Sequence, residues 1–188
     1  NCGISFPSAD TIKFSTGGVE RMQISNSGVT GTGVGGKFAS YAIICDQKGT
    51  STPGGSSSTG TFNTRDLNTE LSDPDGIVSI SSNQFTLQAG SYLIHASSPA
   101  HGAARHQILI WNATDSSIVA VGTSEYSNQS STTTSRAFAT GRTTISGAKA
   151  FEIRHRVGTA KSGDGLGVES NFDTLASIYT LVEIYKES

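Results

Sequence analysis

The chain has 188 residues, which predicts one ordinary domain with a small addition, and only 35% of them are hydrophobic and 15% charged. The 29 Ser, 22 Thr and 22 Gly exclude a helical bundle and favour short strands joined by Gly and Ser turns. A net charge of -2 excludes a basic footprint for nucleic acid, and the short apolar runs exclude membrane insertion, which needs about 20 apolar residues.

The first 30 residues alternate between apolar and polar positions. TIKFS (11–15) and VERMQIS (19–25) flank the pair Gly17-Gly18, which predicts a β-hairpin, and GISF (3–6) predicts a third short strand. So small a piece buries too little apolar surface to fold alone. We therefore expect other copies of the chain to cover it.

The segment GTGVGG (31–36) contains four glycines and predicts a flexible joint. It divides the chain into a β-structured stem or collar over 1–36 and a head over 37–188. Because the first residue is Asn1 and no apolar signal segment follows, we also expect the chain to be part of a longer protein.

The head reads as short strands at regular spacing, with no helical period. Two polar segments, 47–60 and 127–135, are expected to be solvated loops. The expected strands are 39–46, 61–65, 77–80, 84–88, 91–97, 106–112, 117–123, 136–145, 150–157 and 175–185.

The last of these strands is apolar on both faces. Ala176, Ile178, Val182 and Ile184 lie on one face, and Leu175, Tyr179, Leu181 and Tyr185 lie on the other. A strand of an antiparallel sandwich normally has one wet face, so an apolar second face needs a further surface. A neighbouring subunit is the simplest candidate.

Four segments of the head resemble the complement-q and tumour-necrosis-factor-like family. They are 83–97 with Gly90 and Tyr92, 106–126 with Asn112 and Tyr126, the hairpin 143–156, and 172–185. The turn Gly147-Ala148-Lys149 departs from the family pattern because it lacks the usual acidic residue. The resemblance implies an all-β fold, a ten-stranded, two-sheet antiparallel jelly-roll sandwich that assembles as a homotrimer.

The resemblance and the apolar second face together suggest where copies of the chain meet. We expect trimer contacts at Tyr92, Phe151, Ile153, His155, Tyr179, Leu181 and Tyr185.

The stem has a resemblance of its own. ADTIKFSTGGVERMQISNSGVTGTG (9–33) resembles a repeat of phage tail fibres and related adhesins, carried by Phe14 to Gly18 and Glu20 to Met22. In such fibres it implies an intertwined trimeric shaft or collar ahead of a receptor-binding tip, with the remainder of the fibre upstream.

Metal and catalytic patterns are weak. His95, His101, His106 and His155 form no compact zinc spacing, and the acidic turns 73–76 and 162–167 fit turn chemistry better than calcium. Cys2 and Cys45 are expected to be free thiols. No nucleophile elbow or phosphate loop is present, so we expect neither an enzyme nor a cofactor.

Three residues are candidate ligand contacts. His101 and Arg105 fall in the predicted loop 98–105, and Trp111 could stack on a sugar ring or simply pack. Arg154 and Arg156 share a strand face with Glu152, which favours an ion-pair row over an anionic-sugar site.

The sequence therefore predicts the receptor-binding tip of a trimeric viral tail fibre, located on the virion. It would attach to a host cell-surface glycan or outer-membrane receptor by multivalent loop contacts. The alternative is a secreted, extracellular recognition or signalling module of the complement-q type; a secretion signal and glycosylated sequons would favour it, and further shaft repeats would favour the fibre.

Overall fold

The computed structural model describes residues 1–31, 37–130 and 133–188. It contains two compact units, Asn1–Ala39 with Ser188, and Ser40–Glu187. Positions 32–36 of the predicted joint lie outside the described residues, as do positions 131 and 132 of the predicted loop 127–135.

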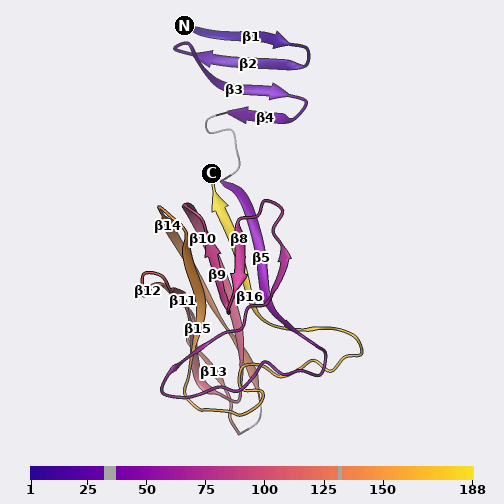
Figure 1. Cartoon of the computed structure of the whole chain (residues 1–188), viewed down its shortest axis with the longest axis vertical. Coiled ribbons are helices and arrows are strands. Elements are labelled where there is room, and N and C mark those ends of the chain that lie inside the picture. The colour runs from indigo at the N-terminus through magenta and orange to yellow at the C-terminus, as the bar shows by residue number, and fades with distance from the viewer. Residues whose placement is uncertain (32–36, 131–132) are drawn as a thin grey trace. The chain divides into compact units, whose positions relative to one another are not determined.

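The first unit is a four-stranded antiparallel meander (Figure 1). Its strands are β1 (Cys2–Ser8), β2 (Thr11–Thr16), β3 (Val19–Ser25) and β4 (Gly28–Gly31). Gly17 and Gly18 both have positive φ, at 61° and 76°, so the β2–β3 turn needs the conformation that glycine adopts without strain. The predicted hairpin and third strand are present, and β4 is an addition that the short, Gly-flanked segment did not indicate.

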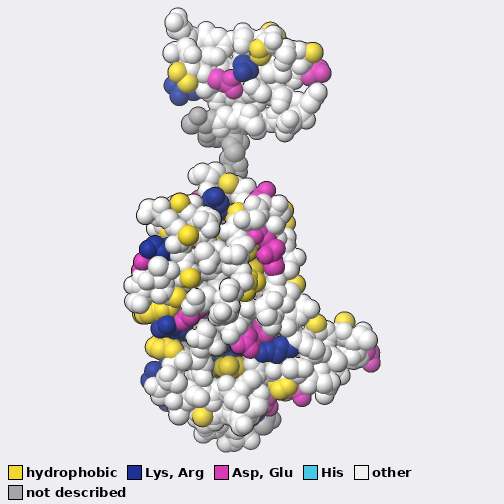
Figure 2. All heavy atoms as spheres, viewed as in Figure 1, with side chains coloured by type: hydrophobic (Ala, Val, Ile, Leu, Met, Phe, Trp, Pro, Cys, Tyr) yellow, Lys and Arg dark blue, Asp and Glu magenta, His cyan; other side chains and the backbone are white. Residues whose placement is uncertain are grey.

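This first unit has no interior of its own. None of its described residues is buried, and Ile4, Phe6 and Val29 are 61%, 73% and 49% exposed. Hydrophobic side chains are visible on its surface in Figure 2. A single chain thus leaves these apolar side chains uncovered. The sequence predicts that other copies of the chain cover them.

The second unit is an antiparallel sandwich of two sheets. One sheet has the order β14 (Thr134–Ile145), β10 (Gly90–His101), β16 (Ser177–Glu187), β5 (Phe38–Lys48), β7 (Thr69–Ser72). The other has the order β12 (Ser117–Val121), β11 (Ala104–Asn112), β15 (Lys149–Val157), β9 (Gln84–Leu87), β8 (Val78–Ser81), with β13 (Glu125–Ser127) beside β11 and β6 (Phe62–Thr64) beside β15. We call them the five-stranded and the seven-stranded sheet. This is the predicted fold class.

The core between the two sheets has an apolar part and a polar part. The apolar part is built from residues such as Ile44, Phe85, Ile94, Ile110 and Val182, all completely buried. The polar part contains the fully buried Arg65, whose guanidinium donates to Thr180 Oγ1 at 2.9 Å, to the Leu166 carbonyl at 2.7 Å and to the Pro99 carbonyl at 3.3 Å. Because its donors are satisfied, a charged side chain can remain in the core.

Several residues expected at a trimer interface lie instead in the core of one chain. Tyr92, Phe151, Ile153 and His155 have no exposed surface, because they occupy the inward positions of β10 and β15. Alternation defines two faces of a strand, but it does not say which face meets the second sheet. These four side chains are therefore unavailable to a neighbouring subunit.

The last strand begins at Ser177, so Leu175 and Ala176 of the predicted faces lie outside it, and Ile178 is 43% exposed. From Tyr179 onward the strand has the two predicted faces, and the chain itself covers part of the outer one. Tyr179 is 2% exposed, and its hydroxyl donates to the Thr52 carbonyl at 2.7 Å, so the predicted loop 47–60 closes over it. Leu181 and Tyr185 are half-buried on the outer face. Tyr179 is therefore also unavailable for the predicted trimer contact, while Leu181 and Tyr185 keep accessible surface.

The segment 98–105 is mostly strand and not the predicted loop. β10 continues to His101 and β11 begins at Ala104, so a tight turn joins them. The turn uses positive φ at Gly102 (56°) and Ala104 (56°). The short strands β7 and β13 were not predicted either.

Candidate ligand-binding pocket

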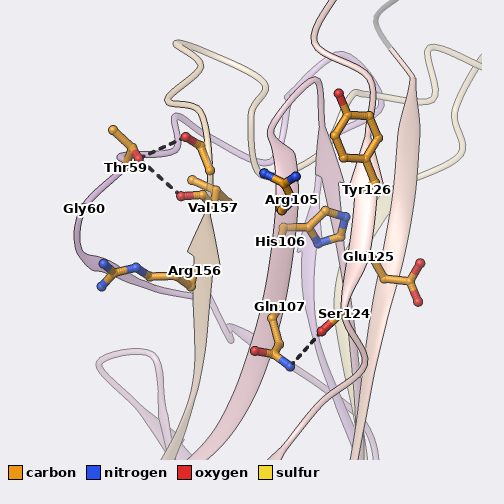
Figure 3. Close-up of a pocket in the computed structure, with 11 residues that line it drawn as sticks. Thr59, Gly60, Arg105, His106, Gln107, Ser124, Glu125, Tyr126, Arg156 and Val157 are labelled. Atoms are coloured by element: carbon orange, nitrogen blue, oxygen red, sulfur yellow. Dashed lines mark hydrogen bonds between the residues drawn. The ribbon is translucent and has the colours of Figure 1, made fainter.

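A pocket of about 780 Å³ opens on the seven-stranded sheet (Figure 3). Three neighbouring strands supply most of its lining: β11, β13 and β15. We call it the arginine pocket, and its lining residues are Thr59, Gly60, Arg105, His106, Gln107, Ser124, Glu125, Tyr126, Arg156, Val157 and Gly158. Its volume falls within the range of about 300 to 1,000 Å³ typical of small-molecule sites.

Strand pairing fixes where the polar side chains stand. Arg105 lies opposite Tyr126 of β13, and Gln107 lies opposite Arg156 of β15. Arg105, Gln107 and Arg156 alternate with the buried His106 and Val157, so all three project from the outer surface of the sheet. The site is therefore held by strands and not by a free loop.

Backbone hydrogen bonds of Gly158 fix one edge of the pocket. Its amide donates to the carbonyls of Arg105 at 2.7 Å and Ala103 at 3.1 Å, and a Cβ at this position would lie 3.2 Å from the Arg105 carbonyl oxygen. Thr59 Oγ1 donates to the carbonyls of Val157 at 3.3 Å and Gly158 at 3.2 Å, as drawn in Figure 3. These bonds hold the segment around Thr59 and Gly60 beside β15.

The pocket carries two arginines that lack acidic partners. Both Arg105 and Arg156 are exposed, and neither forms an ion pair with any described side chain. Arg156 lies over the ring of Phe62, with 5.4 Å from its Cζ to the ring centroid. Glu125 stands on the side of the pocket opposite Arg156 in Figure 3. The lining therefore carries two arginines against one glutamate, a net positive charge on a chain of net negative charge.

A buried histidine pair lies beneath the sheet at the pocket, and of the two rings only His106 belongs to the lining. His106 Nδ1 and His155 Nε2 lie 3.0 Å apart, and His106 Nε2 lies 2.7 Å from Ser135 Oγ. Burial lowers the pKa of His106, and burial together with the charges of Arg65 and His106 lowers the pKa of His155 to about 2. Both rings are neutral at pH 7, so they form a polar but uncharged support beneath the arginines.

Of the three candidate ligand contacts, the structure brings one into this pocket. Arg105 lines it, whereas His101 is 6% exposed and its Nδ1 lies 3.0 Å from Asp164 Oδ2 and 2.8 Å from Lys161 Nζ. His101 is therefore buried and bonded within its own chain at the end of β10, and the prediction that it contacts a ligand is wrong.

Trp111 lies on the same outer face as the pocket but further along β11. The guanidinium of Arg154 stacks on its ring at 4.1 Å and also bonds Glu152 Oε1 at 2.5 Å. The expected ion-pair row is thus present for Arg154 and Glu152, and Trp111 is occupied by packing. Arg156, two residues further along β15, is left out of that pair.

The acidic turns behave as turn chemistry predicts. The two carboxylate oxygens of Asp73 accept from the amides of Ile77 and Val78, both at 2.9 Å. Across the described residues, no cluster of three or more His, Cys, Asp or Glu side chains is suited to a metal ion. Cys2 is an exposed free thiol and Cys45 a buried one, as expected.

Within the described part of the chain, no helix has the length and apolar character needed to cross a membrane. No protein-family model matches the chain, and no curated protein matches its sequence. Comparison with solved structures is more informative.

The globular domain of zebrafish complement 1qA protein matches with a TM-score of 0.50 and 12% identity, covering 78% of this chain and 95% of that one. Murine APRIL, crystallised at pH 5.0, matches with a TM-score of 0.49 and 7% identity over 78% of this chain and 98% of that one. The PRD1 vertex protein P5 matches with a TM-score of 0.47 and 15% identity over 81% and 100%. The second unit thus has the jelly-roll fold of the complement-q globular domain, and a small sheet precedes it in the sequence.

Proposed function

We propose that this chain is the receptor-binding tip of a trimeric viral tail fibre, located on the virion and attached to the remainder of the fibre upstream. It recognises a host cell-surface glycan without chemical turnover or cofactor. The observation that carries the proposal is the arginine pocket, an open site with unpaired polar groups on a rigid sheet. The stem segment 9–33, which resembles tail-fibre repeats, supports the placement in a fibre.

Trimer formation is supported by apolar surface that a single chain leaves uncovered. The outer face of the five-stranded sheet, which we call the apolar face, carries Phe138 at 53% exposure and Tyr41 at 44%, with half-buried Leu93, Leu181 and Tyr185. Leu93 lies opposite Tyr185 and Ser97 opposite Leu181, so β10 and β16 bring these side chains together. A neighbouring copy packed here removes the patch from water.

Three copies on one axis convert weak sites into firm attachment. When one site is engaged, the others bind at a high effective concentration, which raises the apparent affinity by about 10²- to 10⁴-fold. The pocket lies on the sheet opposite the apolar face, so assembly through that face leaves the pocket open.

A secreted, extracellular module of the complement-q type is the second candidate. The match of the head to the zebrafish complement 1qA domain favours it, although at 12% identity that match concerns the fold. Such a module would bind a protein receptor instead of a glycan.

Adsorption of the whole chain to bacterial cells discriminates between these functions. Periodate destroys surface sugars and protease removes surface proteins, so cells of a strain that binds the chain are treated with one or the other. The proposal predicts that periodate abolishes adsorption and that protease leaves it intact. Adsorption that survives periodate and is lost after protease would refute a glycan receptor.

A further inference from the structure

We infer that the arginine pocket binds an acidic sugar unit, with the guanidiniums of Arg105 and Arg156 bracketing its oxyanion. This inference rests on the proposed function, glycan recognition, and assigns the chemical class of the glycan. The shared chemistry is an oxyanion on a sugar ring, whether carboxylate, sulfate or phosphate.

Arg105 and Arg156 start close enough together on the sheet for their long side chains to reach one anion. Arg156 lies opposite Gln107, and Arg105 is two residues from Gln107 on the same strand. Arg105 and Arg156 are therefore diagonal neighbours on the same face, about 7 to 8 Å apart at their Cα atoms, within reach of two long side chains. Gly158, which faces Arg105 across the strands, contributes no side chain to fill the space between them.

Arg105 and Arg156 differ from the other arginines of the head. Arg142 is paired with Glu187 at 2.6 Å, Arg154 with Glu152, and Arg136 donates to the Tyr179 carbonyl at 2.8 Å. Arg65 is fully buried, and each of its three side-chain nitrogens donates a hydrogen bond within the core. The forked donors of Arg105 and Arg156 thus stay available, and Arg is the side chain that binds planar oxyanions in two-point fashion.

The remaining lining fits a sugar better than an acidic peptide. Tyr126, 56% exposed, stands at one margin, whereas Phe62, 43% exposed and outside the lining, has Arg156 over its ring. Exposed rings can stack on the apolar face of a sugar. Gln107 Nε2 donates to the Gly122 carbonyl at 2.8 Å, which orients the amide and leaves its Oε1 free to accept from a sugar hydroxyl.

The test is calorimetric titration of the intact chain with short saccharides. The acidic probes are hexuronate trisaccharides of the glucose, galactose and mannose series, sialyllactose, and a sulfated and a phosphorylated trisaccharide. Each carboxylate probe is matched by its methyl ester, which removes the charge and keeps the ring. We expect at least one acidic probe to bind, and a carboxylate probe to lose at least tenfold in affinity on esterification. The sulfated and phosphorylated probes identify which oxyanion is preferred.

Variants locate the binding. Arg105→Gln and Arg156→Gln should each lower the affinity about 10- to 100-fold, as expected for loss of a hydrogen bond to a charged group. Arg105→Lys should recover part of this loss, since it restores charge without the fork. Arg21→Gln, which removes the same charge from the stem, is the matched control and should change nothing.

Three results would overturn the inference. They are binding to none of the acidic probes, equal affinity for an acid and its ester, and acidic binding that survives both Gln substitutions. Periodate-sensitive adsorption to cells that is unchanged in the two Gln variants would overturn the acidic site alone, and the proposed glycan function would stand.

Discussion

The two sheets of the head expose very different outer faces. On the five-stranded sheet, the apolar face gathers Phe138, Leu181 and Tyr185, and its arginines are engaged within the chain. On the seven-stranded sheet, Arg105 and Arg156 form no ion pair with any described side chain, and the exposed ring of Tyr126 lines the same pocket. An interface between subunits favours apolar surface with its charges neutralised, whereas a site for a polar ligand needs donors that remain available. Under the proposed function, the contrast gives assembly to one sheet and recognition to the other.

The largest effect should come from a charge on the apolar face. Leu181→Glu would bury a carboxylate without a partner in each of three copies, at several kcal/mol per ion. We expect the mass measured by light scattering to fall from that of a trimer to that of a monomer. Ile118→Glu, on the exposed strand β12 of the other sheet, is the control and should remain trimeric. A trimer that survives Leu181→Glu would place assembly elsewhere.

Phe151→Ala tests whether the buried residues of the predicted trimer interface stabilise the single chain instead. Phe151 is completely buried and stacks on Phe85 with ring centroids 5.6 Å apart. Its loss should cost about 3 to 5 kcal/mol of unfolding free energy, measured by urea titration. The cost should be the same in the monomeric Leu181→Glu background. A cost that vanished in that background would show that Phe151 stabilises the trimer alone.

Acid should weaken the head through the histidine pair. The pKa of His155 is about 2 when folded, against 6.5 as its ordinary value. Below pH 6.5, His155 therefore binds a proton in the unfolded chain but stays neutral in the folded chain. The free energy of unfolding should fall by roughly 1.5 to 2 kcal/mol between pH 6.5 and pH 5.

Substitution isolates this effect. His155→Phe should lower stability at pH 7 and flatten its fall towards pH 5, while His95→Phe on the half-exposed outer face of β10 should keep the original slope. Urea titrations at the two pH values measure both. An unchanged slope in His155→Phe would assign the acid sensitivity to other groups.

The smallest expected effect is a difference in ligand affinity between losing an exposed ring on one face and losing one on the other. Tyr126→Ala should reduce affinity for an acidic trisaccharide by about 3- to 10-fold, equivalent to about 0.7 to 1.4 kcal/mol for one ring contact. Tyr41→Ala, which removes an exposed ring of the other sheet, should leave this affinity unchanged. Equal losses in the two variants would argue against a single site at the pocket.

The sequence predicted the sandwich and, from Tyr179 onward, the two faces of its last strand, because strand alternation and turn glycines are local signals. Val182 and Ile184 point into the core as the pattern indicates. The face that meets the second sheet depends on long-range packing, which is why Tyr92, Phe151, Ile153 and His155 were expected at the wrong surface. For the same reason no sequence signal indicated that Arg65 is buried.

For the site, the sequence proposed Arg105 as a contact, and the structure places it in the pocket lining, but its surroundings were not predicted. The pairing of Gln107 with Arg156, and of Arg105 with Tyr126, joins segments far apart in the chain. The charge pattern of β15 favoured an ion-pair row, and that is right for Arg154. Arg156 is free because Glu152 serves Arg154, a choice between two arginines that spacing does not decide.

Hydroxyl-radical footprinting of the intact chain tests most directly whether one sheet face forms the trimer interface and the other binds the ligand. Before ligand is added, Phe138 and Tyr185 should be protected, and Tyr126 and Phe62 should be oxidised readily. An acidic trisaccharide that binds should then protect Tyr126 and Phe62 and leave Phe138 as it was. Oxidation of Phe138 as fast as that of Tyr126, or protection of Tyr126 before any ligand is added, would contradict the account.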